Sequence, residues 1–91
     1  MAAPMNLTSE NEPARQVNAL GLLCPLPVFR TAEAIQAVND GQLVEVLADD
    51  GPFEEDLREW CEETGHELVE IVDLGGRWRA RVRKRAAGKG T

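Results

Sequence analysis

The most constraining feature of this sequence is a repeated change in the spacing of its apolar residues. Residues 15–20 alternate polar with apolar side chains, which predicts a short strand leading to Gly21. Residues 43–48 are short and mostly apolar, as in an interior strand. A segment with helical spacing follows each of these strands. The apolar residues of the two helical segments are Val28, Ala32, Ile35 and Val38, and then Phe53, Leu57, Trp60 and Cys61.

Proline, glycine and acidic residues mark the ends of the two predicted helices. Pro25 predicts the start of the first helix, because a proline at the first helical position loses no intrahelical hydrogen bond. Turn residues before Gly41 predict its end. Asp49 and Asp50 supply turn and N-cap residues for the second helix, which is expected to stop at Gly65.

A glycine pair, Gly75-Gly76, separates two extended runs at residues 67–74 and 77–84, which predicts a tight hairpin. An even-length loop places one set of side chains on the core face: Val69, Ile71, Trp78, Ala80 and Val82. The same alternation places four arginines on the other face: Arg77, Arg79, Arg81 and Arg83.

The predicted element order is therefore βαβαββ. Because a βαβ unit crosses over right-handed, its two strands are parallel. We predict an α/β (α+β) fold: a two-layer α/β sandwich with a mixed four-stranded sheet and both helices on one face. The 91 residues make one small domain, which we place at residues 15–85, with residues 1–14 and 86–91 as flexible tails.

The charge distribution is uneven. The net charge is −6, all sixteen acidic residues precede Arg77, and seven of the ten Lys and Arg lie at or after it. This field argues against non-specific nucleic-acid binding. No apolar stretch approaches the roughly 20 residues that cross a bilayer, and the N-terminus lacks a signal core. We therefore expect a cytoplasmic protein, no membrane partner, and free thiols.

Cys24 is the main candidate for chemistry, because it lies just before a predicted helix start. Unpaired N–H groups and the helix dipole at such a place stabilise a thiolate, and can lower a cysteine pKa from about 8.5 to roughly 3.5–7.5. Pro25 and Pro27 restrict the backbone around the thiol and are expected to present it at the surface. The alternative, a small buried hydrophobic residue, fits this context less well.

The other polar candidates have simpler interpretations. Cys61 lies on an apolar helix face, so packing is favoured over a resolving thiol. His66 is either an acid/base group, a ligand or an ordinary strand-start residue, and the last is favoured. Asp49 and Asp50 are better explained as turn and cap residues than as an acid/base pair. We expect no metal and no cofactor.

Four sequence features together resemble the TusA family of sulfur-carrier proteins, also called SirA-like, over about residues 15–85. They are Gly21-Leu22-Leu23-Cys24-Pro25-Leu26-Pro27-Val28, the Asp49-Asp50 turn, the cysteine of the second helix, and Gly65-His66-Glu67-Leu68. The resemblance implies that Cys24 accepts sulfane sulfur as a persulfide, with Gly21, Pro25 and Pro27 supporting it. It also implies a cysteine desulfurase or rhodanese-like donor and an acceptor protein, serving tRNA thiolation, molybdenum-cofactor metabolism or sulfur oxidation.

This sequence departs from the family pattern at Asn18, where Asp is common, and at Glu33, where a basic residue is common. Its turn also reads Asp-Asp-Gly-Pro rather than Asp-Pro. These changes concern the partner more than the sulfur chemistry. The candidate docking residues are Arg30, Asp49, Asp50, Arg77, Arg79, Arg81 and Arg83.

Two other function classes compete with the carrier. In a binding module for RNA or an acidic partner, the basic C-terminal strand makes the contacts and Cys24 is incidental. The simpler explanation of these arginines is the solvent face of an edge strand, with Glu70 pairing across the hairpin. A thiol redox protein is disfavoured, because no second cysteine is near Cys24 in sequence.

Overall fold

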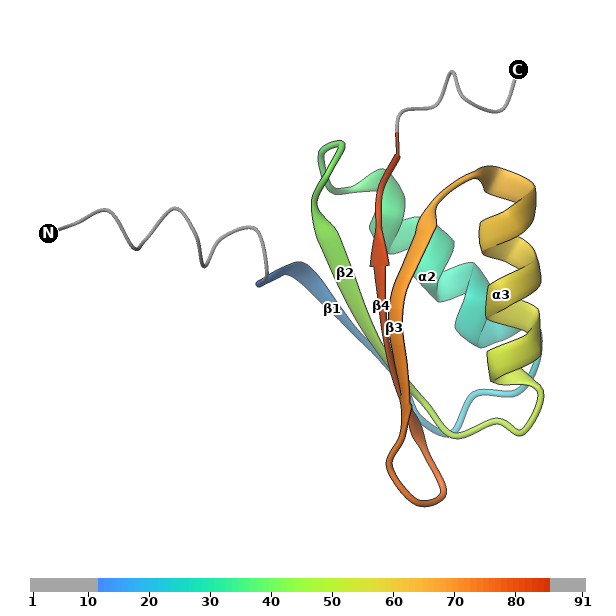
Figure 1. Ribbon diagram of the computed structural model, residues 1–91. Helices are drawn as coiled ribbons and strands as arrows, with labels where there is room; N and C mark the ends of the chain where they lie inside the picture. The colour runs from blue at the N-terminus through green and yellow to red at the C-terminus, as the bar shows by residue number, and fades with distance from the viewer. Residues whose placement is uncertain (1–11, 86–91) are drawn as a thin grey trace, which may run out of the picture.

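The computed structural model describes residues 12–85 and confirms the predicted element order (Figure 1). Within that range the elements are β1 (Pro13–Ala19), α2 (Leu26–Gln36), β2 (Leu43–Ala48), α3 (Phe53–Thr64), β3 (Glu67–Asp73) and β4 (Trp78–Arg83). The first strand begins at Pro13, so two residues that we assigned to the N-terminal tail belong to the sheet. Glu12 lies exposed ahead of this strand, and the remaining residues of the two predicted tails, 1–11 and 86–91, lie outside the described residues.

The four strands form one mixed sheet in the order β1-β2-β4-β3. Strands β1 and β2 are parallel, and β4 runs antiparallel to both β2 and β3. Both helices cover the same face of the sheet, which gives the predicted two-layer sandwich (Figure 1). The prediction that the arginine strand lies at an edge is wrong, because β4 inserts between β2 and β3.

The hairpin between β3 and β4 closes at the predicted glycine pair. Gly75 and Gly76 have φ values of 83° and 94°, a left-handed conformation that glycine adopts without steric cost. The N–H of Leu74 donates to the carbonyl of Arg77 at 2.7 Å. The register shifts between Leu68 and Glu70, so Val69 lies at a bulge and is 39% exposed. Val69 is therefore not on the core face, contrary to the prediction, and Leu68 packs there with Ile71 instead.

The core lies between the sheet and the two helices. The central strands contribute fully buried side chains, and Ile35, Phe53 and Leu57 cover them from the helix layer. The fully buried strand residues are Ala19, Val44, Val46, Ala48, Ala80 and Val82. The polar Thr31 is also fully buried, because its hydroxyl donates to the carbonyl of Pro27 one turn earlier, at 2.9 Å. Helix α2 ends at Gln36, earlier than predicted.

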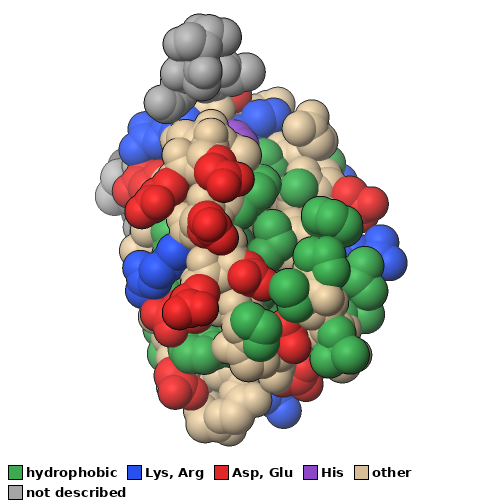
Figure 2. All heavy atoms as spheres, turned by 90° about the vertical axis from the view of Figure 1, so that its right-hand side faces the viewer, with side chains coloured by type: hydrophobic (Ala, Val, Ile, Leu, Met, Phe, Trp, Pro, Cys, Tyr) green, Lys and Arg blue, Asp and Glu red, His purple; other side chains and the backbone are tan. Residues whose placement is uncertain are grey.

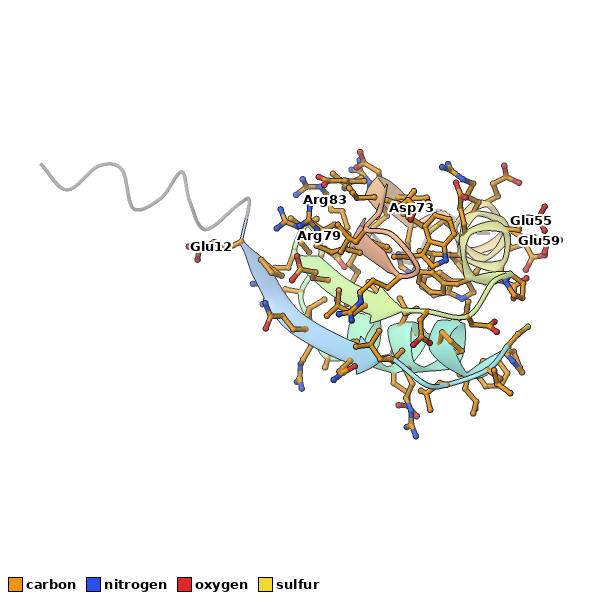
Figure 3. All side chains as sticks on the ribbon, turned by 90° about the horizontal axis from the view of Figure 1, so that it is seen from below. Glu12, Glu55, Glu59, Asp73, Arg79 and Arg83 are labelled. Carbon is orange, nitrogen blue, oxygen red and sulfur yellow. The ribbon has the colours of Figure 1, made fainter. Side chains whose placement is uncertain are left out.

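The open face of the sheet carries a network of arginines and glutamates. Glu45 on β2 accepts from Arg81 at 3.1 Å and lies 3.9 Å from Arg79, which also pairs with Glu70 at 3.0 Å. This confirms the expected pairing of Glu70 across the hairpin. Figure 3 shows Arg79 and Arg83 on the side of the sheet away from the helices. The side chains of these pairs keep 15–39% of their surface exposed, so each pair is expected to contribute about 1 kcal/mol or less.

Neither helix within residues 12–85 has the length and apolar character needed to cross a bilayer.

Leu57 is fully buried at the centre of the helix layer, so truncating it is expected to leave a cavity. Leu57→Ala should lower the free energy of unfolding by about 2–5 kcal/mol. Leu74 is 45% exposed at the hairpin, and Leu74→Ala should cost about 0.5 kcal/mol or less. Urea denaturation of both variants, with unchanged m-values, measures the difference. Equal losses in the two variants would place the core elsewhere.

Candidate functional site

Two loops meet where the parallel strands β1 and β2 end. Ala19 pairs with Ala48 at the carboxyl ends of these strands. The chain then enters α2 through residues 20–25 and α3 through residues 49–52. Both loops lie at the same end of the sheet, beside the starts of the two helices (Figure 1). Open α/β sheets place their functional residues at this end, because the loops that follow parallel strands converge there.

The carboxylates of Asp49 and Asp50 hold the loop that carries the thiol. Asp49 Oδ1 accepts from the N–H of Gly21 at 2.9 Å, and Asp50 Oδ2 accepts from the N–H of Cys24 at 3.0 Å. Gly21 has a φ of 82°, so a side chain there would strain the turn. The predicted side-chain cap is wrong: Pro52 is the N-cap of α3, and no side chain caps it. These acids instead fix the position of Cys24.

The two prolines lie one position earlier in the helix than predicted. Helix α2 begins at Leu26, so Pro25 is its N-cap and Pro27 its second residue. The Cys24–Pro25 peptide bond is cis. Pro27 is buried, whereas Cys24 and Pro25 are exposed.

The Cys24 thiol is exposed and donates a hydrogen bond to Asp56 Oδ2 at 2.8 Å. Asp56 lies in the first turn of α3. This hydrogen bond raises the pKa of the thiol above its usual value, and desolvation and the charges of Asp56 and Asp50 raise it further. The predicted lowering of the pKa by the dipole of α2 is therefore wrong. The sulfur meets a carboxylate of the neighbouring helix, and this hydrogen bond favours the protonated thiol.

The other thiol and the histidine lie elsewhere. Cys61 is buried in the core, where desolvation raises its pKa to about 11, which confirms the packing role. His66 Nδ1 accepts from the N–H of Arg85 at 3.1 Å, and its ring lies 5.3 Å from that of Trp60. Desolvation and the charge of Lys84 lower the pKa of His66. Among residues 12–85, no three His, Cys, Asp or Glu side chains are placed to share a metal ion.

A groove of about 250 Å³ opens beside the thiol, between α2 and α3. Its lining is Cys24, Pro25, Val28, Phe29, Asp56, Glu59, Trp60 and Glu63. Figure 2 shows this side of the molecule, where apolar side chains lie next to a row of acidic ones. The sequence patterns did not predict Asp56, Phe29 or Glu59 as site residues. No local pattern marks them, because only the packing of α3 against α2 brings them to Cys24.

The candidate docking residues do not gather in one place. Asp49 and Asp50 contact the thiol loop, while Arg30 pairs with Glu33 on the exposed side of α2. Arg77 lies exposed in the hairpin loop. The other three candidates pair with glutamates on the open face of the sheet: Arg79, Arg81 and Arg83. The structure thus separates the arginines of the sheet from the cysteine.

Known proteins share both this sequence pattern and this fold. The profile of the family described as Sulfurtransferase TusA matches residues 15–84. The sulfur carrier protein TusA of Allochromatium vinosum is 33% identical over 70 residues, which cover 77% of this chain and 92% of that protein. The protein YrkI of Bacillus subtilis is 41% identical over 59 residues, 65% of this chain and 79% of YrkI.

The crystal structure of a SirA-like protein from Desulfitobacterium hafniense superposes with a TM-score of 0.68 at 24% identity, covering 79% of this chain and 99% of the other. This likeness shows the fold, in which the loop between β1 and α2 carries the exposed thiol. The chain belongs to the TusA family of sulfur carriers.

Removing the charge of Asp56 should make Cys24 more acidic. In Asp56→Asn the carboxylate that raises the thiol pKa is gone, so the pKa should fall and alkylation by iodoacetamide at neutral pH should become faster. The pH dependence of the alkylation rate measures this shift. Glu55→Gln is the matched control, since it removes a neighbouring charge outside the groove. An unchanged midpoint in Asp56→Asn would show that the hydrogen bond does not control the thiol.

The two cysteines should differ sharply in reactivity. Cys24 is exposed, while Cys61 is buried and has a pKa of about 11. Iodoacetamide at pH 8 should therefore add one label to the native protein, located at Cys24 by peptide mapping, and two after denaturation. Labelling of Cys61 in the native protein at the rate of Cys24 would contradict its buried position.

Proposed function

We propose that Cys24 carries sulfane sulfur as a persulfide, taking it from a donor protein and passing it to an acceptor. The donor we favour is a cysteine desulfurase or a rhodanese-like protein in the cytoplasm. The observation that carries the proposal is an exposed thiol, held by Asp50 through its own backbone N–H, in a chain of the sulfur-carrier family. The acceptor would belong to tRNA thiolation, molybdenum-cofactor metabolism or sulfur oxidation, the pathways that TusA-like carriers serve.

Loading begins with attack by the Cys24 sulfur on the outer sulfur of the donor persulfide. The bond between the two donor sulfurs breaks as the new S–S bond forms, and the donor cysteine leaves as a thiolate that takes up a proton. The net change is Cys24–SH plus R–S–SH to Cys24–S–SH plus R–SH, with no oxidant or reductant consumed. Asp56 Oδ2, at 2.8 Å from the sulfur, is the group placed to accept the thiol proton.

Release uses the same residues in reverse. An acceptor thiol gives its proton to Asp56 as its sulfur attacks the outer sulfur of Cys24–S–SH, and Asp56 passes that proton to the departing Cys24 sulfur. The outer sulfur stands about 2 Å beyond Sγ, so an already exposed thiol presents it further into solvent. The same raised pKa makes the Cys24 sulfur a poorer leaving group as an anion, so its protonation by Asp56 assists release.

The RNA-binding alternative has weaker support. Arg79, Arg81 and Arg83 already have glutamate partners on the sheet, and the net charge of the chain is −6. Phosphate binding there would compete with these ion pairs.

Incubation with a persulfide-loaded cysteine desulfurase tests the proposal. Intact-mass measurement should show a gain of one sulfur, about 32 Da, that dithiothreitol removes. Cys24→Ser should show no gain, whereas Cys61→Ser should load as the wild type does. A gain that survives Cys24→Ser, or its absence from the wild type with every desulfurase and rhodanese tested, would refute the carrier role.

A further inference from the structure

We propose that the groove between α2 and α3 is a docking site for a partner segment that presents an apolar side chain next to Lys or Arg. The acidic residues that line the groove repel a donor segment that carries Asp or Glu at the same place. The partner meant is the sulfur-exchanging protein, so its identity rests on the proposed function. The recognition itself is a property of the groove.

The apolar half of this surface is concentrated at the thiol. Of the five large hydrophobic side chains exposed in residues 12–85, three lie within five residues of Cys24 in the sequence. Leu23 is 70% exposed, Leu26 42% and Phe29 58%. Phe29 and the half-buried Trp60 also line the groove. Single exposed hydrophobic residues scattered over a surface are common and need no explanation. A group of them next to a reactive atom is typical of a protein–protein contact.

The acidic half comes from one face of α3. Asp56, Glu59 and Glu63 line the groove at spacings of three and four residues, which places them one above the other on the helix. No Lys or Arg of the described residues pairs with Glu59 or Glu63, whereas Glu54 on the same helix pairs with Arg58 at 2.9 Å. Figure 3 shows Glu59 pointing away from the sheet, and Figure 2 shows acidic side chains next to apolar ones on this side of the molecule.

An apolar surface with a rim of one charge sign fits a partner with the same apolar character and the opposite charge. A partner cation beside Glu59 and Glu63 forms ion pairs that these two residues lack within the described part of the free protein. An anionic donor must bring its charge toward three carboxylates, so the same residues act against it. A docked cation would also offset the charges that raise the Cys24 pKa, so the thiolate would form mainly when the right partner is bound.

Mixed-disulfide exchange with short peptides tests the recognition directly. Each peptide carries one cysteine as a disulfide with thionitrobenzoate. Attack by Cys24 on the peptide sulfur forms the protein–peptide disulfide and releases thionitrobenzoate, which is read by absorbance. Three peptides differ only in the residues that flank the cysteine: Leu with Lys, Leu with Glu, and Ser with Lys. All rates are measured in a Cys61→Ser background.

The Leu–Lys peptide should react about fivefold faster or more than the Leu–Glu peptide at low ionic strength, and the ratio should shrink as salt is added. It should also react faster than the Ser–Lys peptide, and Phe29→Ser should reduce that second difference. Glu59→Gln with Glu63→Gln should abolish the preference for Lys over Glu.

The matched control is Glu55→Gln with Glu62→Gln, which makes the same change in net charge on the same helix. Neither residue lines the groove, and Glu62 borders a separate hollow beside His66. The control should keep the preference. Equal rates for Lys and Glu peptides, or equal loss of preference in both double variants, would overturn the proposal.

This readout is independent of sulfur carriage. Disulfide exchange requires only an accessible Cys24, so a protein that fails to load sulfur can still show the peptide preference. Conversely, sulfur loading with no peptide preference would leave the carrier role standing and refute the docking site alone.

Discussion

The sulfur site depends on two hydrogen bonds that cross from one βα unit to the other. Asp49 and Asp50 follow the end of β2, and Gly21 and Cys24 follow the end of β1. The carboxylates of the two acids accept hydrogen bonds from the backbone N–H groups of Gly21 and Cys24. The parallel pairing of Ala19 with Ala48 brings these four residues together. Hydrogen bonds to charged acceptors are among the stronger ones in proteins, although both of these are exposed to solvent. The thiol is therefore positioned by tertiary structure and not by its own helix.

Local patterns were sufficient to predict most of the fold. Alternating and helical spacings gave β1, α2, β2 and α3, and Gly75-Gly76 gave the hairpin, because each of these elements is encoded within a short window. The position of β4 inside the sheet is not encoded that way. It follows from long-range pairing with β2, which is why we mistook its arginines for the solvent face of an edge strand. The bulge at Val69 has the same origin, since a register shift depends on both strands.

The sequence marked the cysteine, Gly21 and the acids Asp49 and Asp50 as candidates, but not the electrostatics of the thiol. Cys24 precedes the helix and is exposed, as its sequence context indicated. The structure raises the pKa of the thiol, whereas the sequence predicted that it would be lowered. The cause is Asp56, which lies 32 residues further along the chain and reaches the sulfur only through the packing of α3. A resting thiol of raised pKa suits a carrier that must not react indiscriminately. Its reactivity would then depend on what docks beside it.

Amide hydrogen exchange at Gly21 and Cys24 tests the central claim most directly, because each amide has a single carboxylate acceptor in the structure. We predict that both amides exchange at least about tenfold slower than in an unstructured chain. In Asp50→Ala the protection of Cys24 should be lost, while amides in the interior of β2 keep theirs. An unprotected Cys24 amide in the wild type, or unchanged protection in Asp50→Ala, would contradict the claim that these carboxylates hold the sulfur site.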